Sequence, residues 1–155
     1  MIGIEPSVVD VFVIRPRADG WRVLLLRRAE GVRCPGAWET VHGSIEPGER
    51  PEQAAVRELR EETGLDCERL YNVTVHAFYL HHVASVKMAI VFAAFVAEPA
   101  GPLALGPEHD EARWLTVDEA AEQFFWPSAR RHVRDIQAVL GGGDAGPAED
   151  VLRVI

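Results

Sequence analysis

The sequence predicts a single α/β domain in which a mixed β-sheet lies between helices. The chain has 155 residues, an ordinary length for one compact domain. Segments rich in β-branched and aliphatic residues alternate with helical patterns, in the order β-β-α-β-β-α-α. We expect residues 1–140 to form this domain and residues 141–155, which begin with a run of glycines, to form a flexible tail.

The first expected elements are a β-hairpin, a loop and a short extended segment. Residues 8–14 and 22–26 have strand composition, and the Arg-Ala-Asp-Gly stretch at 17–20 is typical of a turn between paired strands. Glycine and proline at 30–38 indicate a loop, after which residues 39–42 are expected to be extended.

One long helix follows, over residues 51–63. Pro51 suits the first helical turn because its missing N–H would have no helical partner there, and Glu52 complements the positive end of the helix dipole. Gly64 is placed to end the helix in a left-handed conformation.

After this helix the pattern returns to strands. Residues 70–83 and 86–96 are β-type runs that we expect to pair as antiparallel strands. Residues 99–107, rich in proline and glycine, indicate a loop, and residues 112–115 a short strand.

The last expected elements are two helices. The stretch from Thr116 to Glu119 resembles a capping box that opens the first of them. Ser128 is expected to cap the second, which reaches about Leu140. The long helix at 51–63 and this last helix would then cover the faces of the sheet.

Charge and cysteine content exclude several classes of function. The net charge of −8 opposes binding to duplex nucleic acid, which needs clustered Lys and Arg. Cys34 and Cys67 lie far apart and outside any CxxC pattern, which favours neither a disulfide framework nor a zinc site. The longest strongly apolar stretch, 88–97, is too short for a membrane span, and the N-terminus lacks a signal-like pattern. We therefore expect a cytoplasmic protein without membrane partners.

The helix at 51–63 gathers carboxylates on one side. At about 100° per residue, Glu58, Glu61 and Glu62 fall within a sector of about 100°, beside an apolar stripe that includes Ala55 and Leu59. These like charges repel one another unless a cation is present. Carboxylate oxygens suit hard cations such as Mg²⁺ or Mn²⁺. The alternative is a solvated acidic helix face, and it is disfavoured because Gly43, Glu49, Arg57 and Gly64 are also in the register described next.

The same segment resembles the Nudix box. From Gly43 to Leu65 the chain reads GSIEPGERPEQAAVRELREETGL, and it matches the box at every defining position. The resemblance implies the Nudix fold and a Mg²⁺- or Mn²⁺-dependent hydrolase that uses water to cleave a diphosphate linkage. The implied substrate is a small nucleoside diphosphate-linked molecule.

The resemblance also assigns roles to box residues. The implied metal ligands are one backbone carbonyl and a group of carboxylates: Gly43, Glu49, Glu58, Glu61 and Glu62. Glu49 either completes this set or orients water, and Arg57 is expected to pair with Glu49 and fix the loop. Members of the family take the general base from the box or from a distal loop. The candidates here are Glu61, Glu62, Glu108 and Glu111.

Four residues outside the box are candidates for substrate contact. Arg27 and Arg28 end the second predicted strand and are placed to reach a phosphate. Trp38 belongs to a segment similar to the Gly-x-Trp element that usually precedes the box. His42 stands where many relatives have glycine, directly before Gly43. The histidines at 76, 81 and 82 lack metal-ligand spacing and are expected to be ordinary polar residues.

Two further resemblances bear on the substrate. The Glu108-His109 loop followed by Trp114, and the Trp126-Pro127-Ser128 stretch, are similar to the bacterial MutT-like branch that hydrolyses nucleoside triphosphates and dihydroneopterin triphosphate. They favour a nucleoside or pterin triphosphate that releases pyrophosphate.

Several alternatives stay open at this point. They are an ADP-ribose or nucleotide-sugar pyrophosphatase, a prenyl diphosphate isomerase and an inactive nucleotide-sensing module. An inactive module is disfavoured because every box glutamate is present. The sequence leaves open which phosphorus is attacked and whether the protein is a homodimer.

Overall fold

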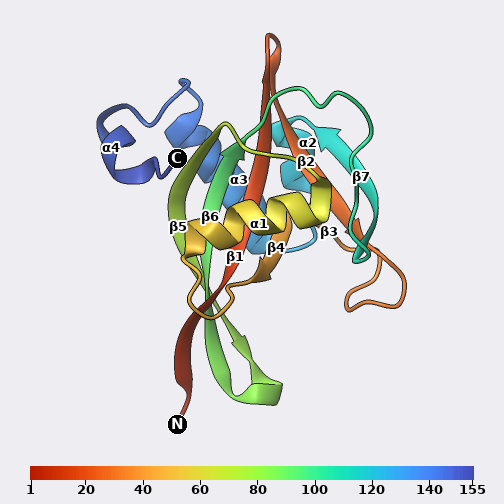
Figure 1. Ribbon diagram of the computed structural model, residues 1–155, viewed down its shortest axis with the longest axis vertical. Coiled ribbons are helices and arrows are strands. Elements are labelled where there is room, and N and C mark those ends of the chain that lie inside the picture. Colours follow the sequence, from red (N-terminus) through yellow and green to blue (C-terminus); the bar gives the residue numbers. More distant parts are fainter.

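The computed structural model describes residues 1–155, apart from the side chains of residues 3–5. The strands are β1 (Gly3–Arg17), β2 (Gly20–Arg28), β3 (Trp38–Glu39), β4 (Val41–Ser44), β5 (Arg69–Leu80), β6 (Ser85–Phe95) and β7 (His109–Leu115). The helices are α1 (Pro51–Thr63), α2 (Val117–Gln123), α3 (Pro127–Leu140) and α4 (Glu149–Leu152), with 3₁₀ turns at His81–Val83 and Gly146–Ala148. The mixed sheet with helices on both faces confirms the predicted fold class (Figure 1).

The strands form one mixed sheet. Its order is β3-β2-β1-β6-β5, with β4 paired to β1 and β7 paired to β2. β1 and β6 run parallel, whereas the β1–β2 and β5–β6 pairs are antiparallel. The hairpin predicted around residues 17–20 is confirmed, with Arg17 opposite Gly20. The expected antiparallel pairing of 70–83 with 86–96 is confirmed for β5 and β6, but residues 81–83 form a 3₁₀ turn between the two strands and not the end of the first.

Alternation along β1 creates two cores, one on each face of the sheet. Val9, Val11 and Val13 belong to the core under α1. Phe12 and Ile14 belong to the core under α2 and α3. All five of these apolar residues are buried, because helices cover both faces.

α1 has the predicted bounds and ends at Gly64 in the left-handed conformation, with φ of 76°. The capping box of α2 is also present, since the Thr116 side chain accepts from the Glu119 N–H. The prediction that Ser128 caps the last helix is wrong. Trp126 is the N-cap residue of α3, and Pro127 occupies the first turn. Proline is well suited to that turn, so the helix begins before the serine.

Thr116 and Ser128 allow a matched test of helix capping, because only Thr116 caps its helix. We expect Thr116→Ala to lower the free energy of unfolding by about 1 kcal/mol, because it removes a side-chain acceptor from the start of α2. Ser128→Ala removes no cap and should change it by only a few tenths of a kcal/mol. Urea denaturation of both variants measures the difference, and equal effects would contradict the assignment of caps.

Residues 141–155, expected from composition to be flexible, lie folded against the domain. Ala145 is buried, and Leu152 packs against the core under α3. The Tyr71 hydroxyl donates to Glu149 at 2.9 Å, and the Val154 N–H donates to the Leu70 carbonyl at 2.9 Å. The end of the chain therefore covers the start of the edge strand β5.

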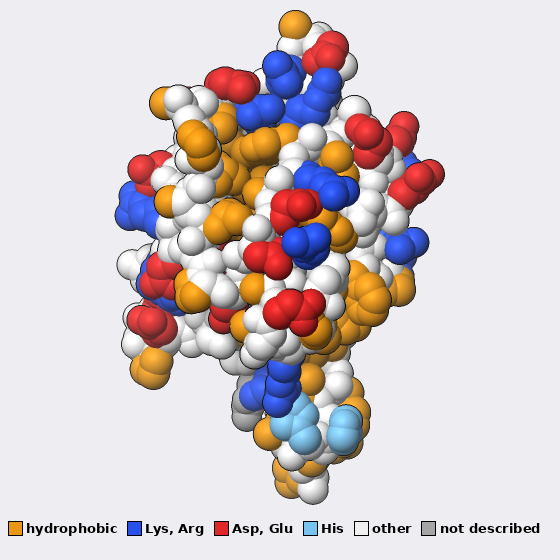
Figure 2. Space-filling view, turned by 90° about the vertical axis from the view of Figure 1, so that its right-hand side faces the viewer, with side chains coloured by type: hydrophobic (Ala, Val, Ile, Leu, Met, Phe, Trp, Pro, Cys, Tyr) orange, Lys and Arg blue, Asp and Glu red, His pale blue; other side chains and the backbone are white. Residues whose placement is uncertain are grey.

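The β5–β6 hairpin projects beyond the body of the domain (Figures 1 and 2). Tyr79 and Val83, near its tip, are each 54% exposed. None of the helices that the structure describes combines the length and apolar character needed to cross a membrane.

Candidate active site

Carboxylates of α1 lie against β4, which precedes the helix in the chain. The buried Glu62 carboxylate accepts the His42 N–H at 3.1 Å. The Glu58 carboxyl group lies directly over Gly43, where an added Cβ would stand 2.1 Å from Glu58 Cδ. Only glycine leaves room at this point for Glu58 to rest on the strand.

Arg57 binds the neighbouring carboxylates together. Its guanidinium pairs with both oxygens of Glu49, at 2.8 and 3.0 Å, so the expected Arg57–Glu49 pair is present. It also donates to Glu58 at 2.7 Å, to Glu61 at 3.2 Å and to the Ser44 carbonyl at 2.8 Å. The hydrogen bond to Glu49 raises the pKa of Arg57 further above its usual range. Arg57 thus fixes the loop before α1 to the helix.

Glu62 has the most perturbed carboxylate of the site. Burial, followed by the negative charge of Glu58, raises the pKa of Glu62 to about 9. Burial also raises the pKa of Glu58. Without an added cation, Glu62 is therefore held in its protonated form at neutral pH.

The donor set fits a hard divalent cation in its chemistry, because it offers only carboxylate and carbonyl oxygens and its carboxylates repel one another. In the part of the chain that the structure describes, no three acidic, His or Cys side chains already converge on one point. Arg57 supplies the positive charge here, so a cation would compete with it for Glu58 and Glu61.

His109 and Glu39, two buried residues beside Glu62, were not predicted as site residues. His109 begins β7, and its Nε2 lies 3.1 Å from Glu39 Oε1. Arg28 Nη1 donates to the same Glu39 oxygen at 2.7 Å. Burial raises the pKa of Glu39, but the hydrogen bonds from His109 and Arg28 outweigh it and leave that pKa lowered. The sequence signal for the His109–Glu39 contact was the Glu108-His109 pair, of which only Glu108 was predicted to be a site residue.

A cavity of about 660 Å³ opens beside these residues, on the α3 face of the sheet. Arg28, Glu39 and His42 are among the residues that line it. The rest of the wall mixes polar and aliphatic side chains with rings from β1, β5 and the α3 region: Phe12, His76, Phe78, Trp126 and His132. None of the α1 carboxylates lines this cavity, but one of its lining residues, His42, donates its backbone N–H to Glu62.

Two histidines, His42 and His76, line this cavity. His42 Nδ1 lies 2.5 Å from Asp10 Oδ1; burial lowers the pKa of His42, but the pairing with Asp10 outweighs it and leaves that pKa raised. His76, expected to be an ordinary strand residue, lines the cavity, and its ring lies 5.4 Å from that of His132. A bulge at Val73 sets the face to which His76 points.

The other predicted site residues outside the box are Arg27, Trp38, Glu108 and Glu111. Arg27 pairs with Asp110 at 2.8 Å, and Trp38 is buried beneath the Arg113 guanidinium, 4.4 Å from its ring centre; neither lines the cavity. Glu108 is exposed on the loop before β7, near enough for its charge to raise the pKa of Glu58 and Glu62. Glu111 is paired with Arg113 at 2.9 Å.

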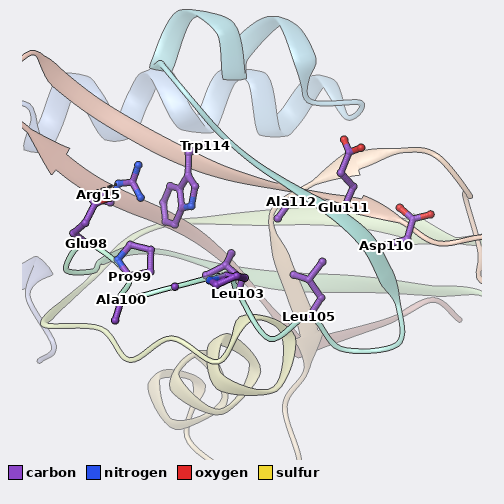
Figure 3. Close-up of a pocket in the computed structure, with 12 residues that line it drawn as sticks. Arg15, Glu98, Pro99, Ala100, Leu103, Leu105, Asp110, Glu111, Ala112 and Trp114 are labelled. Carbon is purple, nitrogen blue, oxygen red and sulfur yellow. Dashed lines mark ion pairs between the residues drawn. The ribbon is translucent and has the colours of Figure 1, made fainter.

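A second hollow, of about 670 Å³, lies between β7 and the loop at 98–105 (Figure 3). The Arg15 guanidinium stacks on Trp114 at 4.4 Å and forms an ion pair with Glu98 at 3.2 Å. Asp110 and Glu111 line its other end. On this side of the molecule, acidic and basic side chains alternate around apolar patches (Figure 2). The hollow holds none of the α1 carboxylates.

Comparison with known proteins agrees with this geometry. The NUDIX domain model matches residues 5–136. The chain is 30% identical over 145 residues to the CTP pyrophosphohydrolase of Escherichia coli, with 92% of this chain and 99% of that protein covered. It is 33% identical over 134 residues to the bis(5'-nucleosyl)-tetraphosphatase of Sus scrofa, covering 83% of each. It is 31% identical over 124 residues to the dihydroneopterin triphosphate diphosphatase of E. coli, covering 73% and 81%.

Other matches differ in how much they cover. An octanoyltransferase of Myxococcus xanthus is 36% identical over 128 residues, but the chain spans only 35% of its length. The crystal structure of a NUDIX hydrolase from Listeria monocytogenes superposes with a TM-score of 0.77 at 20% identity, covering 97% of this chain and 99% of that one. That structure bears on the fold alone. The match over most of the chain, the box and the fold agree, and the chain belongs to the Nudix family of pyrophosphohydrolases.

Proposed function

We propose that this protein hydrolyses a nucleoside or pterin triphosphate in a Mg²⁺- or Mn²⁺-dependent reaction that releases pyrophosphate. The observation that carries the proposal is the position of the cavity. The cavity of about 660 Å³ has aromatic rings in its wall, and it is lined by His42, whose backbone N–H donates to the buried carboxylate of Glu62. A substrate with a flat ring in this cavity would place its phosphates toward α1.

In this proposal, some residues of the cavity hold the ring of the substrate and others hold its phosphates. Trp126 is 46% exposed at the rim of the cavity and offers a ring face for stacking. Arg28 and the Asp10–His42 pair supply polar groups to the cavity wall. The acidic net charge of the protein means that the phosphates need local neutralisation.

A bound divalent cation would supply that charge and polarise the phosphoryl oxygens. Gly43, Glu58, Glu61 and Glu62 are the residues we expect to hold it, with Glu49 completing the set or orienting water. Arg57 keeps the loop before α1 in place. The reaction takes place in the cytoplasm in this proposal and involves neither nucleic acid nor a membrane.

The names of two relatives favour this substrate class, because they act on CTP and on dihydroneopterin triphosphate. A third relative is a dinucleoside tetraphosphatase, which makes such a dinucleotide the main rival, ahead of ADP-ribose and nucleotide sugars. The cavity wall has apolar and aromatic side chains, Phe12, Phe78 and Trp126 among them, against which the ring of such a substrate would pack.

A substrate panel tests the proposal. Nucleoside triphosphates, dihydroneopterin triphosphate, dinucleoside tetraphosphates, ADP-ribose and nucleotide sugars are incubated with the protein and Mg²⁺, and released pyrophosphate is measured against monophosphate. We expect a triphosphate to have the highest kcat/KM, with pyrophosphate as product. A dinucleotide, ADP-ribose or a nucleotide sugar with far higher kcat/KM would contradict the substrate class and leave the family assignment intact.

The position of the two distal glutamates predicts different effects on catalysis. Glu108 is exposed close to Glu58 and Glu62, whereas the Glu111 carboxylate is held by Arg113. If Glu108 is the base, Glu108→Gln should lower kcat by about 100-fold and remove the acidic limb of the pH profile. Glu111→Gln is the matched control and should stay within a few-fold of wild type. A loss below about tenfold with the acidic limb retained in both variants would place the base on α1.

A further inference from the structure

A buried polar connection runs from the cavity to the α1 carboxylates. It begins with Arg28 and Glu39, which line the cavity and pair with each other at 2.7 Å. It continues to His109, whose Nε2 lies 3.1 Å from the same Glu39 oxygen. The His109 side chain is only 1% exposed. Because Glu39 already accepts from Arg28, the hydrogen atom of this contact belongs to the histidine, and Nε2–H is the donor.

The other nitrogen of the ring faces Glu62. His109 Nδ1 is buried and has no hydrogen-bond partner among the described residues. Glu62 Oε1 lies 3.8 Å away, while the second Glu62 oxygen accepts the His42 N–H. With Nε2–H directed at Glu39, Nδ1 accepts from Glu62 when that carboxyl group carries a proton, and donates to it when the ring is an imidazolium. Buried polar atoms without a partner are rare in proteins, so an unpaired Nδ1 beside a carboxyl group points to a hydrogen bond between the two.

We propose that His109 is a positioning residue that sets the orientation of the Glu62 carboxyl group. The proposal rests on the proposed function, because it takes Glu62 to be a ligand of the divalent cation. Closing the gap from 3.8 Å to an ordinary hydrogen bond needs a shift of about 1 Å, which rotation of the Glu62 side chain can supply. Glu39 holds the ring by its far side, so the shift falls on Glu62 rather than on His109.

This connection has a consequence for how the site is assembled. Glu62 is on α1, His109 is on β7, Glu39 is on β3 and Arg28 ends β2. The orientation of a box carboxylate therefore depends on β7, which is far from the box in sequence, and on β2 and β3, which precede the box. Groups that orient metal ligands from behind commonly change metal affinity by about 10- to 100-fold when removed.

Two amide substitutions separate a positioning role from simple space filling. In His109→Asn the side-chain amide reaches the position of Nδ1, so the contact with Glu62 is retained and that with Glu39 is lost. In His109→Gln the amide reaches the position of Nε2, and the reverse holds. We expect His109→Gln to weaken Mn²⁺ binding by about tenfold and His109→Asn by no more than about threefold. Calorimetric titration with Mn²⁺ gives both dissociation constants, and melting temperatures show whether each variant is folded.

Equal changes of Mn²⁺ affinity in the two folded variants would overturn the proposal. A measurement on the wild-type protein covers the case in which a variant does not fold. Nitrogen-15 NMR of the histidine rings should show the His109 Nδ1 resonance move when Mg²⁺ is added, while the exposed His81 and His82 resonances stay fixed. An unchanged His109 resonance in metal-bound protein would overturn the positioning role of His109 and leave the proposed function intact. Failure of the wild-type protein to bind Mn²⁺ would contradict the proposed function, and the positioning role with it.

Discussion

Replacement of Glu62 by glutamine is expected to lower kcat by at least about 100-fold while the protein stays folded. Glutamine has almost the same shape and can still accept the His42 N–H, but it carries no charge to hold a cation. Glu61→Gln should have a comparable effect on kcat. The Glu61 side chain is 57% exposed, so no loss of core packing accompanies that change.

The Glu62 variant also has an expected signature in stability. The folded-state pKa of Glu62 is raised to about 9, above its value of roughly 4.3 in an unfolded chain. Between these values the folded protein holds a proton that the unfolded chain has lost, so metal-free stability falls as pH rises through this range. Glutamine stays neutral, and the metal-free variant should melt no lower than wild type at pH 8 in EDTA. Glu122→Gln, on the exposed side of α2, is the charge-matched control. Near-wild-type kcat in both Glu61→Gln and Glu62→Gln would contradict the role of α1.

Gly43→Ala is expected to lower kcat by about 100-fold with little change in melting temperature. The new methyl group would stand 2.1 Å from Glu58 Cδ, so the carboxyl group has to leave its place over β4. The displaced atoms are the far end of a flexible side chain, and the backbone does not have to move. Stability therefore changes little, whereas the arrangement of carboxylates is lost.

Gly101→Ala provides the control for the glycine substitution, since an added Cβ at Gly101 meets nothing within 4 Å. Its kcat should equal that of wild type. Steady-state kinetics and thermal melting of both variants make the comparison. Wild-type kcat in a folded Gly43→Ala protein would show that the position of Glu58 over Gly43 is unimportant for turnover.

The box and its helix were predictable because their determinants are local. Pro51 and Gly64 mark the ends of α1 by backbone conformation alone, and the structure has these bounds. The grouping of Glu58, Glu61 and Glu62 follows from helical periodicity. The Arg57–Glu49 pair joins residues close in sequence and could be expected from the same segment.

His109 and Glu39 were missed because their meeting depends on pairing between distant strands. β7 adds to β2 on one side, and β3 pairs with the end of β2, which brings residue 109 to residue 39. No spacing in the sequence encodes that contact. The acidic composition of residues 108–111 pointed to Glu108 and Glu111, whereas the buried His109 between them is the residue that contacts Glu39.

Two other predictions differ from the structure for similar reasons: the flexibility of residues 141–155 and the role of His76. The docking of residues 141–155 depends on the Leu70 backbone and the Tyr71 hydroxyl, which composition does not reveal. The cavity side of β5 depends on a one-residue bulge, and such a shift reverses which side chains face inward. His76 therefore lines the cavity, whereas Val75 is 47% exposed.

The central claim is that α1 and its cation direct water to a diphosphate linkage. Phosphorus-31 NMR of the reaction in ¹⁸O-labelled water tests it most directly, with the best triphosphate of the panel and with Mg²⁺ or EDTA present. We predict that the triphosphate gives a monophosphate and pyrophosphate, that one product carries a single ¹⁸O atom, and that EDTA stops the reaction. Unchanged turnover in EDTA, or no cleavage of any diphosphate-linked compound with Mg²⁺ or Mn²⁺, would contradict the account.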